Sequence, residues 1–486
     1  RAQIYYQPTP GSPFVFRNIS FDVEDSTVKA LYLSNREKFS KITSGARLDE
    51  DSIAYERDEI YKLMRRNGYF DFVRPYVRAE IDTNFNNAKA DVKLSILNPG
   101  DSTHQKYILH DTYIRIQPSS GIVDTNFRPE PILVDSQYHF YDYSHFFKPK
   151  KFENYLFLER GEYYNLDNVE LTNQRLFELN VFKSVSLDFG KRKAEPNTLY
   201  SVIDIIPLKK KSNRLDGEYT FNSSITGVNV GLTYQNRNIF GGAELFEVKL
   251  RTGFQFDKNV SGGLKDRLLS RDYQIGASLS FPRLITPFNI PAIGKNGVPH
   301  TKVSSSYQIY QLRESYKRKT IATTLSYDWL EAKNKLHSFS PINLQYTQGE
   351  ISQALADSLF NQGNFYFITT LQSQLIASSI YDYTFNLNRL TDLTNFHFFN
   401  GNIEVGGNLA SVLGNLSKNV DEDGQKLLLG VPYYQFVKVQ GDYRIYKHFG
   451  GERQLVIRFN PGIGYSYGNI KDLPFEKRFF AGGSSG

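Results

Sequence analysis

Two stretches near the end of the chain decide the fold: residues 437–445 read VKVQGDYRI, and residues 455–467 read LVIRFNPGIGYSY. In both, apolar side chains alternate with polar side chains or glycine, as in Val437, Lys438 and Val439. Because successive side chains of a strand point to opposite faces, each stretch predicts a strand with one apolar and one polar face. A water-soluble sandwich could show the same alternation, with its polar face in solvent.

Two further features favour lipid as the medium that covers the apolar face. The strands are long, and aromatic residues, which make up 15% of the chain, gather at their ends. A tilted strand needs about 9–11 residues to cross a bilayer, and transmembrane barrels carry aromatic girdles at both interfaces. We therefore predict a transmembrane antiparallel β-barrel over residues 209–486. The polar residues expected to face its lumen are Glu404, Lys438, Asp442, Arg444 and Arg458.

Composition narrows the function classes. The chain of 486 residues has no cysteine, which excludes disulfides, thiolate metal sites and cysteine nucleophiles. The net charge of +7 is spread along the chain and gives little reason to expect a nucleic acid partner. A G-x-S-x-G pattern at 482–486 lacks the strand, helix and acid–base partners of a serine hydrolase. We therefore expect no enzyme, no metal and no cofactor.

The part of the chain before residue 209 predicts two copies of one α+β unit. The first copy, residues 14–99, has a strand at 14–23, helices at 28–42 and 49–67, and strands at 73–81 and 88–97. The second copy, residues 100–208, has a strand at 107–116, helices at 148–158 and 167–179, and strands at 180–189 and 199–208. Gly45 before Leu48 matches Gly161 before Leu166. Repetition of a supersecondary unit is stronger evidence for the fold than either copy alone. The alternative is two unrelated α+β modules that resemble each other by chance.

These units resemble POTRA domains, the periplasmic modules that precede the barrel in the BamA/TamA superfamily of outer-membrane β-barrel assembly proteins. Three motifs in the barrel half resemble the same superfamily: NRNIFGGAELF at 236–246, SFPRLITPF at 280–288 and LPFEKRFFAGG at 473–483. The details are most similar to the TamA-like (TamL) branch, which is found as a lipoprotein in Bacteroidetes. The resemblance covers nearly the whole chain.

The resemblance implies a chain divided into a lead-in segment at 1–13, POTRA-like units at 14–99 and 100–208, and the barrel at 209–486. It implies the outer membrane of a Gram-negative bacterium, with the N-terminal units in the periplasm. Barrels of the superfamily have sixteen strands, and about eleven are present here. Eleven strands alone would leave two open edges in lipid, so we expect closing strands elsewhere.

The first barrel strand has few apolar residues. Its outer face carries Leu215, Gly217, Tyr219 and Phe221. A strand with few packing contacts opens easily. In the superfamily the first and last strands meet at a weak seam that opens sideways, and an exposed strand edge can template another strand. A frayed barrel start is the alternative interpretation.

Two more expectations concern loops and sheet edges. Phe480, Ala481, Gly482 and Gly483 resemble the start of the sixth extracellular loop, which folds back into the lumen in this superfamily. The inward charges either hold such a loop or line a wet lumen, and the second is the simpler interpretation. In the POTRA-like units, residues 76–81 and 181–189 are candidate edges for clients or partners.

The expected function is to insert β-barrel proteins into the outer membrane. Expected partners are outer-membrane lipids, nascent barrel clients, and a TamB-like or other periplasmic or lipoprotein partner. One alternative is a two-partner secretion pore, whose N-terminal plug helix the lead-in segment is too short to supply. A passive porin or receptor would need no periplasmic modules. A TamB-partnered component of lipid transport is not separated from the first hypothesis by sequence.

Overall fold

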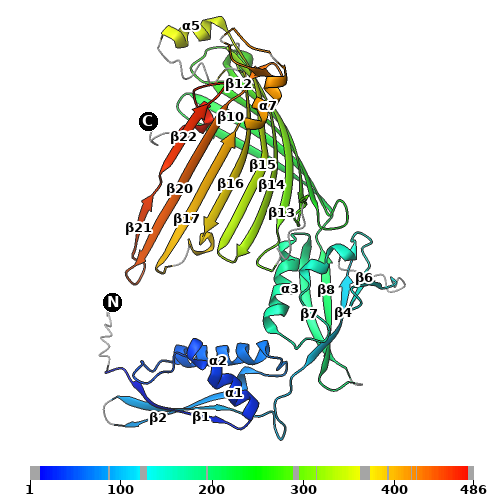
Figure 1. Cartoon of the computed structure of the whole chain (residues 1–486), viewed down its shortest axis with the longest axis vertical. Coiled ribbons are helices and arrows are strands. Elements are labelled where there is room, and N and C mark those ends of the chain that lie inside the picture. Colours follow the sequence, from blue (N-terminus) through cyan, green and yellow to red (C-terminus); the bar gives the residue numbers. More distant parts are fainter. Residues whose placement is uncertain are drawn as a thin grey trace, which may run out of the picture.

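The computed structural model describes residues 11–85, 88–120, 129–192, 195–287, 295–313, 315–361, 371, 373–390, 393–417, 419–422 and 424–479. A three-stranded, a five-stranded and a twelve-stranded sheet follow one another along the chain (Figure 1). In this described part, no helix has the length and apolar character needed to cross a membrane.

The first α+β unit consists of β1 (Val15–Val23), α1 (Ser26–Asn35), η1 (Arg36–Lys38), α2 (Glu50–Arg66), η2 (Arg74–Tyr76), β2 (Val77–Phe85) and β3 (Lys89–Ile96). Its sheet has the order β1-β3-β2, with β1 parallel to the central β3. Asp25 caps α1, because its carboxylate accepts hydrogen bonds from the N–H groups of Thr27 and Val28. Tyr32 and Ile60 bury the helices against the sheet, so the predicted β-α-α-β-β order is confirmed.

The second unit consists of β4 (Ile108–Ile116), β5 (Ile132–Val134), β6 (Tyr138–Asp142), η3 (Pro149–Lys151), η4 (Glu153–Tyr155), α3 (Leu166–Glu178), β7 (Phe182–Lys191) and β8 (Thr198–Pro207). Its sheet order is β5-β6-β4-β8-β7. The insertion thus adds a hairpin, β5–β6, to the repeat. The helix predicted at 148–158 is wrong: η3 and η4 replace it, because Lys148, Lys151 and Tyr155 are held by contacts with the large sheet.

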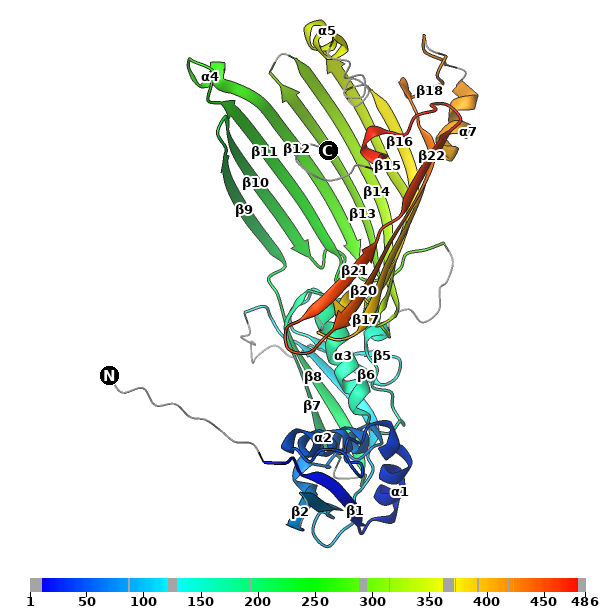
Figure 2. The ribbon, with the colours of Figure 1, turned by 90° about the vertical axis from the view of Figure 1, so that its left-hand side faces the viewer.

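The large sheet consists of β9 (Lys211–Phe221), β10 (Ile225–Arg237), β11 (Leu245–Asp257), β12 (Leu268–Phe281), β13 (His300–Leu312), β14 (Tyr316–Ala332), β15 (Lys335–Ile351), β16 (Gln374–Phe385), β17 (Phe396–Gly406), β20 (Gln435–His448), β21 (Gln454–Phe459) and β22 (Gly462–Tyr467). The strands are antiparallel neighbours in chain order, and β21 and β22 lie in line along β20. Pro461 separates them, and its carbonyl accepts the Gly441 N–H at 2.9 Å. The sheet curves as an open trough whose two edges do not meet (Figure 2).

Short elements cap the end of the sheet that lies away from the second unit: α4 (Leu264–Arg267), α5 (Gln353–Asn361), α7 (Asn408–Ser417), β18 (Leu427–Leu428) and β19 (Val431–Pro432). Two 3-10 turns, η5 (Leu387–Arg389) and η6 (Phe475–Lys477), complete the described elements. The sequence also predicts a barrel strand over residues 401–413, and this prediction is wrong in its second half. The strand ends at Gly406, because Gly407 has a left-handed φ of +81°, and α7 follows.

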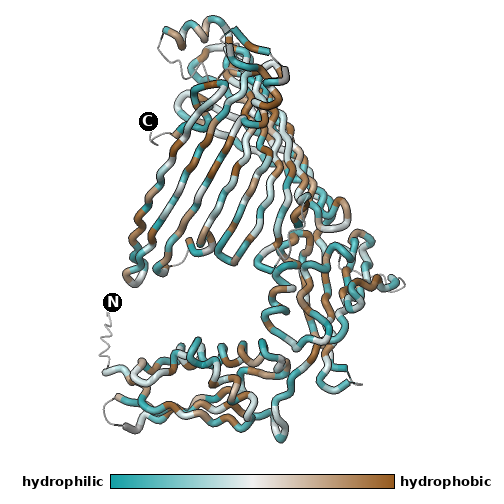
Figure 3. Tube along the Cα trace, in the orientation of Figure 1, coloured by the Kyte–Doolittle hydropathy of each residue, from teal (hydrophilic) through white to brown (hydrophobic). Residues whose placement is uncertain are grey.

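Apolar and polar residues alternate along the strands of the large sheet, as Figure 3 shows in brown and teal. The register is continuous across the first strands: Leu215 pairs with Leu232, Leu232 with Leu250, and Leu250 with Ile275. All four side chains therefore share one face. That face is exposed, and no second sheet covers it within the described residues.

The second unit is fixed to the sheet through the turn between β10 and β11. The Lys148 N–H donates to the Gly241 carbonyl at 2.7 Å, and the Asn238 amide donates to the Phe146 carbonyl at 2.7 Å. Ala243 from this turn belongs to the hydrophobic core of the second unit. The unit and the sheet therefore share one core rather than a flexible link.

Glu244 is the polar centre of this junction. Its fully buried carboxylate accepts hydrogen bonds from Lys151 at 2.8 Å, Arg283 at 2.9 Å and the Gly242 N–H at 2.8 Å. Burial alone would raise the pKa of Glu244, but these three donors outweigh burial and lower its pKa to about 2. A carboxyl group whose pKa falls on folding stabilises the folded state above its unfolded pKa of about 4.3, and this contribution is lost as the pH falls toward 2.

We expect Glu244→Gln to loosen this junction, because the change leaves two cations around a neutral amide. The expected cost is about 2–4 kcal/mol of local opening free energy. Hydrogen exchange of residues 146–156 should be faster in the variant at pH 7. The protection factor, which corrects for the intrinsic pH dependence of exchange, should also fall between pH 5 and pH 3 in the unaltered chain but much less in the variant. Glu159→Gln, which changes an exposed glutamate three residues beyond this segment, is the control. Equal exchange in all three proteins would contradict the assignment.

Candidate functional site

The outer face of the large sheet is an apolar wall. Its exposed large side chains include Val228, Val230, Leu232, Leu250, Tyr273, Ile275, Val303, Tyr307, Ile321, Ile342, Ile403, Val439, Ile457, Ile463 and Tyr465. Water-soluble monomers rarely expose contiguous apolar patches of more than a few hundred Å². A wall that extends over every strand therefore needs an apolar medium around it.

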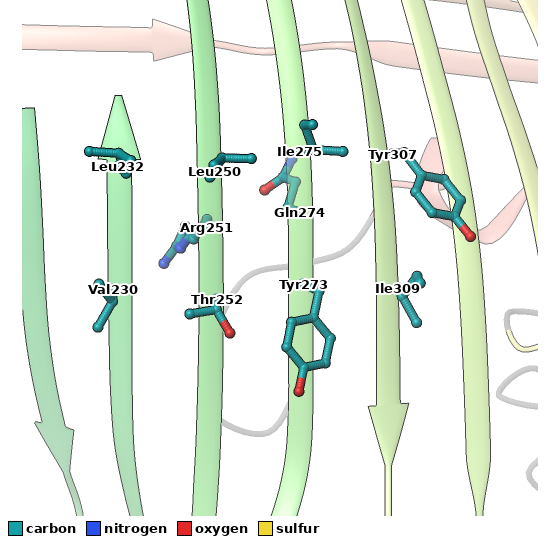
Figure 4. A pocket seen from close by; sticks show the side chains of 10 residues that line it. All are labelled: Val230, Leu232, Leu250, Arg251, Thr252, Tyr273, Gln274, Ile275, Tyr307 and Ile309. Atoms are coloured by element: carbon teal, nitrogen blue, oxygen red, sulfur yellow. The ribbon is translucent and has the colours of Figure 1, made fainter. Parts of the chain in front are cut away.

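A furrow of 380 Å³ runs along this wall across β10, β11, β12 and β13 (Figure 4). Its apolar lining includes Val230, Leu250, Ile275 and Tyr307, each from a different strand. No polar cluster converges on it, so it lacks the features of a site for a polar small molecule. It is the space between neighbouring rows of side chains on an uncovered sheet.

The predicted seam residues Leu215, Gly217, Tyr219 and Phe221 lie on the outer face of β9, which is an edge strand. Among the described residues β9 pairs with β10 alone. The exposed fractions of Leu215 and Tyr219 are 73% and 66%, against 43% for Leu232 on the next strand. Nothing lies within 4 Å of a Cβ built on Gly217. The edge of β9 therefore combines unpaired backbone groups with poorly packed apolar side chains.

The predicted lumen residues all lie on the inner face. Asp442 is buried and accepts hydrogen bonds from two guanidinium groups, at 2.6 and 3.0 Å from Arg444 and at 2.9 and 3.0 Å from Arg458. Such bidentate pairs fix orientation as well as charge. The cluster ties β20 to β21, which is the opposite edge of the sheet from β9.

Glu404 and Lys438 do more than line the lumen, because they hold the segment that follows β22. Lys477 lies 2.7 Å from the buried Glu404 carboxylate, which also accepts a 2.7 Å hydrogen bond from Ser378. The Lys438 ammonium lies 4.5 Å from the ring centroid of Phe479. The interpretation that the inward charges hold a returning segment is therefore favoured over a purely wet lumen.

Two inward glycines on β22 make room for this segment. A Cβ on Gly462 would lie 2.5 Å from the Phe479 ring, and a Cβ on Gly464 would lie 2.6 Å from Leu473. Leu473 packs in turn against the buried cluster of Ile376, Tyr434 and Phe436 on the inner face. Sequence analysis did not identify Lys477, Phe479 or Leu473 as contact residues. The available signal was the pair of glycines, 462 and 464, on the polar face of the alternating stretch.

The remaining chemistry predicted from sequence is limited. Phe480, Ala481, Gly482 and Gly483 lie outside the described residues, as does the G-x-S-x-G pattern at 482–486. Within the described part of the chain, no group of three or more His, Asp or Glu side chains is placed to hold a metal ion. The site therefore offers binding through backbone edges and apolar surface.

We expect Gly462→Ala to displace the returning segment from the inner face of the sheet, because the new methyl group would clash with the Phe479 ring, which lies between Gly462 and Lys438. Trypsin should then cleave after Lys477 or Arg478 about 5–10-fold faster, which corresponds to about 1–1.4 kcal/mol of weakened local packing. Gly217→Ala, where the methyl group meets open space, is the matched control. Unchanged cleavage in Gly462→Ala would show that the segment does not depend on this contact.

Comparisons with known proteins identify the fold. No family model matches the sequence, and no curated protein matches it. The crystal structure of BamA from Haemophilus ducreyi lacking POTRA domains 1–3 matches with a TM-score of 0.52 and 13% sequence identity, over 97% of this chain and 74% of that chain. CdiB from Acinetobacter baumannii matches with a TM-score of 0.41 and 11% identity, over 98% of this chain and 72% of that chain, a likeness too low to support inference.

The match to BamA extends over both α+β units and the large sheet, because it covers 97% of the chain. It does not distinguish the TamA-like branch from other branches. In fold, the chain is similar to BamA: two α+β units are followed by a large antiparallel sheet.

Proposed function

We propose that this protein inserts β-barrel proteins into the outer membrane of a Gram-negative bacterium, with its two POTRA domains in the periplasm. The observation that carries the proposal is the edge of β9, which pairs with β10 alone among the described residues and adjoins the apolar wall. A client strand that pairs with this edge acquires backbone hydrogen bonds before it meets hydrocarbon.

The energetics of this step follow from the medium. Each unpaired N–H or C=O group costs several kcal/mol in the bilayer core, so an open sheet edge there binds any strand of suitable alternation. The outward side chains of β9 supply little packing of their own. On its inward side, the Glu218 carboxylate lies 3.7 Å from Arg251 of β11, a weak and exposed ion pair. The edge is therefore easily exchanged between partners.

The two edges of the sheet differ in a way that supports this direction of templating. The β20–β22 edge is tied together by the Asp442 cluster and by the returning segment anchored at Glu404. The β9 edge has no comparable inner anchor in the described structure. With this arrangement, the β9 edge can exchange its strand partner while the β20–β22 edge keeps its shape.

The POTRA domains supply further edges for clients or for a TamB-like or lipoprotein partner. The predicted edges at 76–81 and 181–189 fall on β2 and β7, and both are outer strands of their sheets. Extended client segments can add to such strands through main-chain hydrogen bonds. Because the second POTRA domain and the sheet share one core, a segment bound at β7 would be held close to the barrel.

The alternatives differ in where a polypeptide or lipid would travel. A two-partner secretion pore would pass its passenger through the lumen, in contact with inward residues such as Ser306. A component of lipid transport would require neither β9 nor the lumen to contact protein clients. The cross-linking experiment below separates insertion from secretion.

We expect an arginine on the outer wall to destabilise the membrane-inserted state and an arginine on the inner wall to be tolerated. Ile275→Arg, in mid-strand on the outer face, should cost about 2–4 kcal/mol in urea unfolding from lipid vesicles. Ser306→Arg, on the neighbouring strand but facing the lumen, should cost less than about 1 kcal/mol. Similar costs for the two variants would contradict a lipid-facing wall.

We expect a client strand to form disulfides with β9. Because the chain has no cysteine, Leu215→Cys, Gly217→Cys and Tyr219→Cys each provide one thiol. With a barrel client that carries one cysteine in its last strand, cross-links should exceed those of Ile275→Cys about tenfold. Moving the client cysteine by two residues should move the preferred position on β9 by two. Cross-links confined to Ser306→Cys would support secretion and overturn insertion by strand templating.

A further inference from the structure

The end of the sheet away from the POTRA domains carries a short helix, α7, with an apolar face that no described residue covers. The exposed fractions of Leu409, Val412 and Leu413 are 71%, 61% and 46%. These positions follow the i, i+3, i+4 spacing of a single helix face. The sequence of α7, NLASVLGNLS, contains no charged residue.

The register of the strands places α7 on the outer side of the sheet. Ile321 of the outer wall pairs with Tyr346, and Tyr346 pairs with Leu375. Leu375 is nonetheless buried, because Ala410 of α7 and Tyr433 pack on it. The lumen side of the same region is occupied by the returning segment, which packs on the cluster that contains Ile376.

Several contacts fix α7 and the β18–β19 hairpin to the wall. The Gly407 N–H donates to the Ala377 carbonyl at 2.7 Å, and the Tyr467 hydroxyl donates to the Asn408 side chain at 2.8 Å. The Tyr346 hydroxyl donates to the Leu429 carbonyl at 3.2 Å, at the tip of the hairpin. α7 is therefore built onto the outer wall and is not a loose loop.

Aromatic residues surround α7 and indicate its position along the membrane normal. Tyr346, Tyr433, Tyr465 and Tyr467 gather around α7 and the end of β22, where aromatic girdles of membrane barrels meet the lipid headgroups. Leu429, at the hairpin tip, is 73% exposed and adds to the same apolar surface. An uncharged helix with one apolar face at this level has the properties of an interfacial helix.

We propose that α7 and the β18–β19 hairpin form a lipid-docking surface that inserts Leu409, Val412, Leu413 and Leu429 into the outer leaflet of the bilayer. The occupant is lipid acyl chain, because the surface is continuous with the apolar wall and carries no charge on α7. The proposal rests on the proposed membrane insertion of the sheet. Its consequence is that the extracellular ends of β15 and β16 are anchored at the membrane surface.

Single spin labels test the proposal, since every introduced cysteine is unique in this chain. The full protein is reconstituted into phosphatidylcholine vesicles with a label at Val412→Cys, Ile275→Cys or Asp357→Cys. The Ile275 label reports on the outer wall. The Asp357 label, on the exposed α5, reports on water. We expect the Val412 label to resemble the Ile275 label, with at least about fivefold greater relaxation by oxygen than by a water-soluble nickel chelate.

The outcomes separate this proposal from the proposed function. A Val412 label relaxed mainly by the nickel chelate, beside an oxygen-accessible Ile275 label, would overturn the docking surface alone. Low accessibility of the Val412 label to both reagents, with spin–spin broadening that disappears on dilution with unlabelled protein, would assign the surface to a second copy of the chain and also overturn it. A nickel-accessible Ile275 label would overturn the membrane insertion on which both proposals depend.

Discussion

The rest of the structure depends on one constraint: in a sheet with an apolar outer face, every backbone N–H and C=O group needs a hydrogen-bond partner on a neighbouring strand. Alternation along the strands gathers a continuous set of apolar side chains on the outer face, and no second sheet in the described chain covers that face. In an apolar medium the strand ladders are then obligatory, because no water can replace them. The same requirement makes the two sheet edges, β9 and β21–β22, the places where the sheet can acquire another strand.

Two buried ion pairs fix other parts of the sheet and leave the β9 edge free of such contacts in the described chain. The buried carboxylate of Glu244 joins the second α+β unit to the turns of the sheet, and Glu404 holds the returning segment against the inner face at the opposite end of the sheet. Both are buried acids paired with lysine, a design in which loss of either partner is costly. β9 lies outside both anchors. A sheet that is fixed at its base and at one edge has a single side on which exchange of partners costs little.

The sequence was sufficient for features that depend on period alone. The alternation of residues 437–445 predicted which side chains face outward, and the seam residues on β9 followed from the same rule. Features that depend on contacts between distant segments could not be predicted. The 3-10 turns at 149–155 exist because Lys151 and Tyr155 reach the large sheet, and α7 interrupts a predicted strand because Gly407 turns the chain onto the outer wall. The anchoring of Lys477 by Glu404 joins residues 73 positions apart, which no local pattern records.

The most direct test of the lipid-facing wall uses the only tryptophan of the chain. Trp329 lies near the end of β14 that faces the second α+β unit, two residues beyond Tyr327 on the outer face, with its ring stacked on His337. In vesicles of brominated phosphatidylcholine, its fluorescence should be quenched more strongly by bromine near the headgroup than by bromine near the chain end. Fluorescence that is unaffected by bromine at any depth would contradict the account.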